Sequence, residues 1–261
     1  MLKRRLIPVL NIMNGLIVRS EDFQVHQNIG NVINQAQRYN EWEVDELIYL
    51  DISRGENYDL NRDDHKVQSY SSIEEIIKRI SKVCFMPLAF GGGIKCMEDV
   101  DIRIKNGADK VIINTAVFLN PCFITEVSQK YGKQAIIVSV DYKYIDNRNV
   151  VFIKNGSENT NVDVINWCQK AESLGAGEIF LNSIDRDGIG EGYDIKFINQ
   201  VVTSLSIPTI ACGGAGDFWD FVDLAAESEV SAIAAGNIFH FTERSYPRAK
   251  QLLKKENANV R

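Results

Sequence analysis

The sequence MPLAFGGGI at residues 86–94 is echoed by IPTIACGGAG at residues 207–216, and this repetition indicates the fold. In both stretches a short apolar run ends in a cluster of glycines. A second matching pair, VDELIYLDISR (44–54) and AGEIFLNSIDR (176–186), precedes the two glycine clusters. Self-similarity within one chain is the signature of a repeated architecture. We therefore expect two halves that carry the same devices.

Short apolar runs alternate with amphipathic segments about eight times along the chain. The runs are apolar on both faces, as the strands of a helix-covered parallel sheet must be, and their number favours a closed barrel. The expected strands are 6–12, 46–52, 86–90, 110–114, 135–141, 178–184, 207–212 and 230–235. The expected helices are 29–42, 73–83, 97–107, 121–131, 162–174, 194–205, 217–227 and 243–256. The predicted fold class is α/β, a single (β/α)8 TIM barrel over residues 1–261, with half-barrels at about 1–132 and 133–261.

Two segments interrupt this rhythm. Residues 53–72 are polar and long for a strand-to-helix loop, and loops of that length tend to be lids or binding loops. Residues 142–161 hold the apolar run VVFIK between the turn signals DNRN and NGSEN, which predicts a β-hairpin. Both segments follow strands, so we expect them at the carboxyl-terminal mouth, where barrel active sites lie.

Composition limits the classes of function. A formal net charge of −6 argues against nucleic acid and anionic membranes as partners. No stretch approaches the ~20 apolar residues of a membrane helix, so a cytoplasmic protein is expected. The three histidines lie far apart and the cysteines lack metal-binding spacing, so we expect neither a metal site nor a cofactor. The cysteines are expected to be buried or half-buried free thiols: Cys84, Cys96, Cys122, Cys168 and Cys212.

The glycine clusters are typical of anion sites. Gly91, Gly92 and Gly93 follow the third expected strand, and Gly213, Gly214 and Gly216 follow the seventh. Glycine lets backbone N–H groups approach an anion closely, and a helix that starts just afterwards adds its positive end. The fourth and eighth strands end in Asn114-Thr115 and Ala235-Gly236, beside the glycine loop of each half. Two such sites at one mouth predict a ligand with a phosphate at both ends; the alternative is that the glycines only form tight turns.

Polar residues at strand ends are candidates for proton transfer. Asp141 ends the fifth strand, and a carboxylate there can shuttle a proton. Asn11 holds the matching place on the first strand, where it can form hydrogen bonds but cannot act as a base. Arg19 and Lys143 could neutralise phosphate or developing negative charge. Three further carboxylates end strands or begin their loops, with loop capping as the alternative for the first two: Asp51, Asp185 and Asp187.

At this point the chain resembles a known family, the cyclase subunit of imidazole-glycerol-phosphate synthase, from end to end. The matching stretches are IPVLNIMNG, DELIYLDIS, GGGI, GADKVIINTAV, DRDGIGEGYD, IACGGAG and the closing IFHF, several of them specific over five or more residues. The resemblance implies a barrel that receives ammonia from a docked glutaminase and condenses it with a substrate bearing two phosphates. The implied partners are a glutaminase subunit at the amino-terminal face and a phosphorylated small molecule.

The resemblance also assigns roles to residues. The family's phosphate contacts fall in one half on Gly93, Asn114 and Thr115, and in the other on Asp187, Gly188, Gly214 and the Ala235-Gly236 region. The family's ring of charges at the barrel's amino-terminal end, where ammonia enters, falls on Arg5, Glu46, Lys110 and Glu178. All four residues carry the expected sign of charge, so the resemblance implies a retained ammonia route. Charges at the bottom of a barrel otherwise serve stability alone.

The mouth departs from the family pattern. The family has two catalytic aspartates, whereas this chain has Asn11 and Asp141 at those places. Arg19 replaces the family's lysine in the first loop, and Asn182 stands where a hydroxyl residue is expected on the sixth strand. The loop after the second strand carries an insertion within 53–72. Loss of one carboxylate of an acid/base pair typically lowers the reaction rate ~10²–10⁴-fold, so we expect the cyclisation chemistry to be altered.

Three hypotheses follow. The first is a member of the family's glycosyl-amidation branch, which supplies ammonia for converting an acetamido sugar into an acetamidino sugar in surface-polysaccharide biosynthesis. The second is an authentic cyclase of histidine biosynthesis that tolerates Asn11. The third is a non-catalytic scaffold that activates the glutaminase. A single-chain sugar isomerase on the same fold is weaker, because that chemistry needs aspartates at both symmetric positions and only Asp141 is present.

Overall fold

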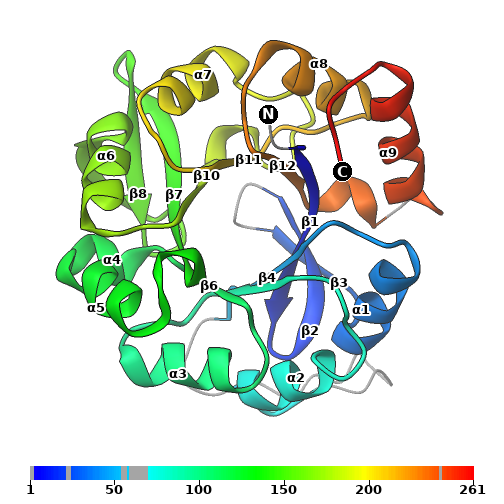
Figure 1. Ribbon diagram of the computed structural model, residues 1–261, viewed down its shortest axis with the longest axis horizontal. Helices are drawn as coiled ribbons and strands as arrows, with labels where there is room; N and C mark the ends of the chain where they lie inside the picture. The colour runs from blue at the N-terminus through cyan, green and yellow to red at the C-terminus, as the bar shows by residue number, and fades with distance from the viewer. Residues whose placement is uncertain (1–2, 22–24, 54–57, 59–69, 241–242) are drawn as a thin grey trace.

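The computed structural model describes residues 3–21, 25–53, 58, 70–240 and 243–261. Eight parallel strands close into a barrel because the β7–β10 pairing joins the two ends of the order β10-β11-β12-β1-β4-β5-β6-β7. The predicted (β/α)8 barrel is therefore confirmed (Figure 1). The barrel strands are β1 (Arg5–Met13), β4 (Leu47–Asp51), β5 (Leu88–Gly91), β6 (Lys110–Ile113), β7 (Ile136–Ile145), β10 (Glu178–Ser183), β11 (Thr209–Cys212) and β12 (Ala232–Ala235).

Helices surround the barrel and cover the outer faces of its strands (Figure 1). Each expected helix is present, with ends shifted by a few residues, and a short extra helix, α4, follows β6. Among the described residues, no helix is long and apolar enough to cross a membrane. The helices are α1 (Val32–Glu41), α2 (Ile73–Ile80), α3 (Met97–Lys105), α4 (Thr115–Leu119), α5 (Cys122–Tyr131), α6 (Val164–Leu174), α7 (Ile195–Thr203), α8 (Trp219–Glu227) and α9 (Ser245–Lys255).

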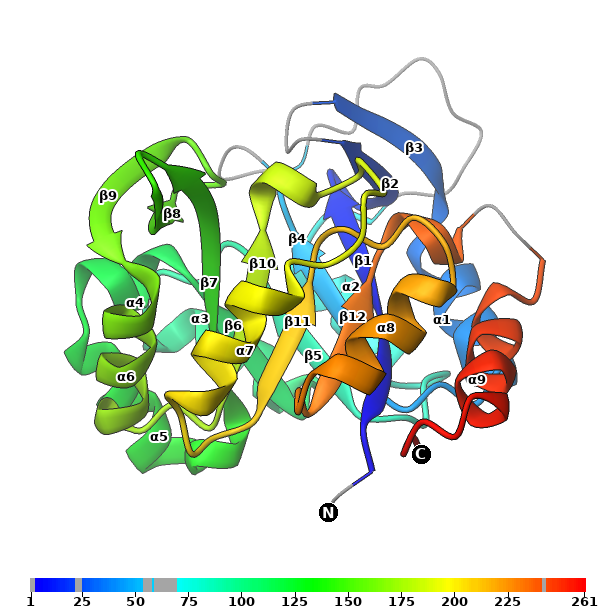
Figure 2. The ribbon, with the colours of Figure 1, turned by 90° about the horizontal axis from the view of Figure 1, so that it is seen from above.

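In each half of the barrel, a β-hairpin extends the first strand. The predicted hairpin within 142–161 is confirmed as an extension of β7 that pairs with β8 (Arg148–Ile153) and β9 (Glu158–Asp163). A second hairpin, β2 (Leu16–Glu21) and β3 (Val25–Asn31), follows β1 and was not predicted. The expected helix 29–42 is wrong at its start, since 29–31 belong to β3. Figure 2 shows both hairpins at the end of the barrel opposite the chain termini.

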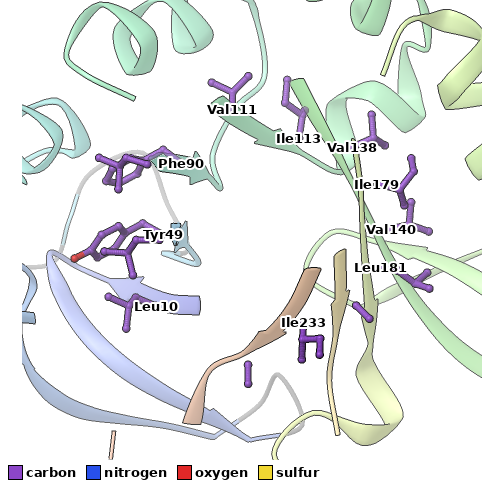
Figure 3. Close-up of a cluster of buried hydrophobic side chains, with 14 of the residues drawn as sticks. Leu10, Tyr49, Phe90, Val111, Ile113, Val138, Val140, Ile179, Leu181 and Ile233 are labelled. Atoms are coloured by element: carbon purple, nitrogen blue, oxygen red, sulfur yellow. The ribbon is translucent and has the colours of Figure 1, made fainter. Parts of the chain in front are cut away.

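The core has two layers because side chains alternate across each strand. In β1, Leu6 and Leu10 face the helices, whereas Ile7 and Val9 face the barrel axis. The outer layer is the larger, and Figure 3 shows its strand side chains spread around the barrel wall. The axial layer is apolar at mid-height and consists of Ile7, Val9, Ile48, Ala89, Ile112, Ile137, Phe180, Ile210, Cys212, Ala232 and Ala234.

The alternation places polar side chains at both ends of the axial layer. In β7 the inward series runs Ile137, Ser139, Asp141 from the amino-terminal end to the carboxyl-terminal end. In β10 the corresponding series runs Glu178, Phe180, Asn182. The barrel axis is therefore charged at the bottom, apolar in the middle and polar at the mouth.

The strand registers show the twofold repeat. Asn11 of β1 pairs with Leu50 of β4, and Asp141 of β7 pairs with Asn182 of β10, so Asn11 and Asp141 hold equivalent places. Both hairpins also lead into a helix through a capping side chain. Asn31 accepts hydrogen bonds from the first turn of α1, as Asp163 does from that of α6.

Candidate active site at the barrel mouth

The carboxyl-terminal ends of the strands surround a cavity of about 610 Å³. Its lining comes from both halves and includes the glycine loop of the first half and the strand ends of the second. An adjoining cavity of about 500 Å³ contains the glycine loop of the second half. The two cavities share Asp187, Cys212, Gly236 and Asn237, so both glycine loops open at the same end of the molecule.

The loop after β5 requires glycine. Gly92 and Gly93 have φ values of 86° and 63°, in the left-handed region that favours glycine. A Cβ at Gly92 would lie 1.9 Å from the carbonyl oxygen of Asp51, so no other residue fits without a shift of the backbone. Beside this loop, Thr115 Oγ1 accepts a hydrogen bond of 2.9 Å from the backbone N–H of Lys154. The loop can therefore present backbone donors to the cavity beside a hydroxyl group.

The loop after β11 has the same construction. Gly213 and Gly214 have φ values of 91° and 122°, and a Cβ at Gly213 would lie 2.5 Å from the carbonyl oxygen of Ser183. Gly188, with φ 77°, lines the same cavity together with Ala235. Arg19, on β2, also lines this cavity and brings a permanent positive charge to it. This half of the mouth thus combines backbone donors with a cation.

Asp141 is the buried carboxylate of the main cavity. It is 8% exposed and accepts hydrogen bonds from Asn114 Nδ2 at 3.0 Å and from Asn182 Nδ2 and Ser139 Oγ at 3.4 Å. Burial raises the pKa of Asp141 to about 6, although Asn182 and Ser139 favour the carboxylate. A carboxyl group with this pKa can both accept and donate a proton near neutral pH.

Amides occupy the positions around Asp141. Asn11 and Asn182 both line the main cavity. The Oδ1 of Asn182 is buried and has no hydrogen-bond partner among the described residues, so it can accept a hydrogen bond from a ligand. Ser139 was missed from the sequence; the signal was its spacing of two residues from Asp141 on one strand, which places both side chains on the axis.

The remaining predicted residues divide between the cavity and the structure around it. Asp51 lines the main cavity and accepts hydrogen bonds from Tyr58 Oη at 2.6 Å and from the Ser53 N–H at 3.0 Å, as expected of a loop cap. Asp185 also has a structural role, because it accepts a hydrogen bond of 2.7 Å from the Tyr144 N–H. Lys143 was expected near phosphate, but its Nζ lies 5.3 Å from the Phe152 ring and it lines neither cavity in the described part of the chain.

Two expectations need further comment. Cys96 and Cys122 are exposed, so the prediction that all cysteines are buried or half-buried is wrong for these two; each lies at the start of a helix on the outside of the barrel. The prediction of a lid within 53–72 falls largely on residues 54–57 and 59–69, which lie outside the described residues.

Among the described residues, no group of three or more His, Cys, Asp or Glu side chains could hold a metal ion.

The four charged residues at the opposite end form a closed ring. Arg5 donates to Glu46 and to Glu178 at 2.6 Å each, and Lys110 donates to Glu46 at 2.9 Å and to Glu178 at 2.5 Å. Burial disfavours the charge on Glu178, but Arg5 and Lys110 outweigh it and lower the pKa of Glu178 below its ordinary value. Burial likewise opposes the charge on Arg5, yet the two glutamates raise its pKa. Arg5 and Glu178 therefore stay ionised at the foot of the apolar axial layer.

The fold and the site define a class: a (β/α)8 barrel with two glycine loops and a buried carboxylate at one mouth. Comparison with known proteins gives the family. A model described as "Histidine biosynthesis protein" matches residues 5–245, and the chain belongs to this family.

Similarity to individual members extends over the whole chain. The "Imidazole glycerol phosphate synthase subunit HisF" of Staphylococcus carnosus is 38% identical over 263 residues, which cover 100% of this chain and 99% of the relative. The proteins of the same name from Hydrogenobaculum sp. and Sulfurisphaera tokodaii are 38% and 39% identical over 262 and 261 residues, with complete coverage of both chains. The resemblance seen in the sequence is thereby confirmed.

Proposed function

We propose that this protein is the synthase subunit of a glutamine amidotransferase that uses ammonia from a partner glutaminase to amidate a phosphorylated sugar or nucleotide sugar of surface-polysaccharide biosynthesis. The observation that carries the proposal is Asn11. It occupies the β1 position equivalent to Asp141. The mouth therefore has one proton-transfer group at these two positions, where the cyclase subunits that the sequence resembles have two.

An ammonia route is supported by the composition of the axis. The ring of Arg5, Glu46, Lys110 and Glu178 lies below a layer of apolar side chains, and Asp141 lies above it. An apolar passage suits neutral ammonia better than ammonium, because a cation loses its hydration there. The face that carries the ring is therefore where we place the glutaminase.

A phosphorylated acceptor is supported by the two glycine loops. Each offers backbone N–H donors in the left-handed region, and Arg19 adds a cation beside the second loop. The unpartnered Oδ1 of Asn182 offers an acceptor for a hydroxyl or N–H group of the ligand. Such a mouth suits a polar molecule that carries phosphate, as a nucleotide sugar does.

The test is a deletion strain of the source organism. Loss of this chain should leave histidine prototrophy intact and replace acetamidino groups of the surface polysaccharide by acetamido groups, as measured by mass spectrometry after labelling with ¹⁵N-amide glutamine. In vitro, the purified chain should not cyclise the family's doubly phosphorylated histidine precursor with free ammonium. Robust turnover in that assay would contradict the proposal.

A second function is favoured by the full-length identity of 38–39% to subunits named for imidazole glycerol phosphate synthase. Under it, this chain is a cyclase of histidine biosynthesis in which one carboxylate suffices. Complementation of a histidine auxotroph that lacks its cyclase subunit would establish this function, with the Asp141→Asn variant as the inactive control.

A further inference from the structure

The helix after the first glycine loop contains a buried arginine. Arg103 of α3 is 2% exposed and lies on the same buried face of the helix as Val100. A charged side chain is almost never buried to this degree without partners. Its contacts therefore indicate why the chain keeps a charge where an apolar side chain would pack.

Arg103 holds the glycine loop from below. Its Nη2 donates to the carbonyl oxygen of Gly92 at 2.6 Å, and its Nη1 donates to the carbonyl oxygen of Asp99 at 2.9 Å. A Cβ built on Gly93 would lie 3.5 Å from the same Nη2, so the guanidinium also lies close to Gly93. Burial lowers the pKa of Arg103, with Asp99 and Asp51 acting in the opposite direction, and a guanidinium remains charged in proteins.

The second half of the barrel has no such charge at the matching place. Gly92 and Gly213 have equivalent conformations, with φ 86° and 91°, and a spacing of 121 residues. The same spacing carries Arg103 onto Leu224, which is fully buried in α8. The repeat therefore shows that an apolar residue fits this position, and that the arginine is a property of one half.

The hydrogen bond has a directional consequence for the loop. The peptide between Gly92 and Gly93 is trans, so its C=O and N–H point in opposite directions. Because Arg103 holds the Gly92 carbonyl toward α3, the N–H of Gly93 is directed away from α3, toward the cavity that Gly93 lines. A charged donor on the carbonyl also polarises the peptide and makes its N–H a stronger donor.

We propose that Arg103 is a positioning residue that strengthens the anion site at the Gly92-Gly93 loop. It fixes the loop peptide and adds a positive charge behind it, without touching the ligand. The inference rests on the proposed function in that the ligand is a phosphorylated molecule, and it assigns the phosphate site that depends on a buried arginine to this half of the mouth.

Inorganic phosphate is the probe, titrated into the full-length ¹⁵N-labelled chain while the amide signals of Gly93 and Gly214 report the two sites separately. The wild type should show saturable binding of phosphate at both signals. Arg103→Met should raise the Kd at Gly93 about tenfold and leave the Kd at Gly214 unchanged. Arg103→Gln keeps a donor without the charge and should give an intermediate Kd; it carries the test if the Met variant does not fold. Leu224→Met is the matched control and should change neither Kd.

The outcomes separate this inference from the proposed function. Saturable binding at both loops with an unchanged Kd at Gly93 in a folded Arg103 variant would overturn the role of Arg103 alone. An equal loss at both loops would do the same, because it would show a general effect on the fold. Absence of binding at either loop in the wild type would overturn the phosphate sites themselves, and the inference with them.

Discussion

At the scale of single residues, Asp141 is the group on which the proposed chemistry depends. It is buried, and its hydrogen-bond partners are the neutral groups of Asn114, Asn182 and Ser139, so no cation compensates its charge among these contacts. Asp141→Asn removes proton transfer and keeps the volume. We expect ammonia-dependent product formation to fall by about 10²–10⁴-fold. The measurement is acetamidino-sugar content in a deletion strain that expresses the variant. Unchanged flux would favour the scaffold hypothesis.

The same residue destabilises the fold at neutral pH. Burial raises the pKa of Asp141 to about 6 from an unfolded value of about 3.9, so the folded state binds the proton more tightly than the unfolded chain does. The contribution of Asp141 to stability is therefore most favourable below about pH 4, falls as the pH rises to about 6, and stays lower above it. The difference between the folded and unfolded pKa of this group corresponds to roughly 3 kcal/mol.

A prediction follows for Asp141→Asn: at pH 8 it should be more stable than the wild type by roughly 1–3 kcal/mol, and near pH 4 the difference should vanish. The range allows for imperfect hydrogen bonding of the new amide. Urea denaturation at the two pH values measures this difference. A variant that is less stable at pH 8 would contradict the buried-charge interpretation.

At the scale of elements, the first glycine loop allows a matched comparison of substitutions at two adjacent residues, Gly92 and Gly93. Gly92→Ala places a Cβ 1.9 Å from the Asp51 carbonyl oxygen, whereas the nearest described atom to a Cβ at Gly93 is Nη2 of Arg103, at an ordinary contact distance of 3.5 Å. Both positions have positive φ, so the strain of that conformation, about 1–2 kcal/mol, is shared. Gly92→Ala should therefore cost clearly more than Gly93→Ala in the free energy of unfolding. Equal costs would show that the loop moves freely away from β4.

The sequence predicted most of the elements, because covered parallel strands are apolar throughout and stand out between amphipathic helices. The β1–β2 hairpin was missed although Asn14-Gly15 carries its turn signal. Their φ values of 49° and 78° resemble the 50° and 63° of Asp146 and Asn147, which turn the hairpin that was predicted. Strong alternation was absent from the polar strand β3, so its last three residues, 29–31, were assigned to the helix.

The site was predictable where one strand register determines it. Asn11, Asp141 and Asn182 lie on inward-facing positions that follow from alternation alone. Arg103 could not be found in this way, because nothing in the sequence indicates that a single arginine on a helix is buried. Its role depends on a contact with the carbonyl of Gly92, eleven residues away, which only the packing of α3 against the barrel reveals.

At the scale of the whole molecule, the barrel separates charge at its two ends by an apolar layer. The ring below is neutral as a set, with two cations and two carboxylates in contact. A buried ring of this kind is weak support for stability, because the loss of hydration offsets much of the attraction between the charges. Its retention is better explained by a task at the amino-terminal face.

Single and combined replacements in the ring test this explanation. Arg5→Met leaves Glu46 and Glu178 buried with Lys110 alone, and should cost about 3–5 kcal/mol of stability. The neutral set Arg5→Met, Glu46→Gln, Lys110→Met and Glu178→Gln removes the charges together, so its stability should lie close to that of the wild type. Denaturant unfolding distinguishes the two.

The neutral set also tests the proposed function. The neutral set should keep activity with free ammonium, since ammonia then reaches the mouth from solution and Asp141 is unchanged. Its glutamine-dependent activity should fall, because in the proposed complex the glutaminase delivers ammonia to a face that no longer presents the ring. The ratio of the two activities measures this coupling without reference to expression level. If the ratio is unchanged in the folded variant, the ring serves only the architecture of the barrel, and ammonia reaches Asp141 by another path.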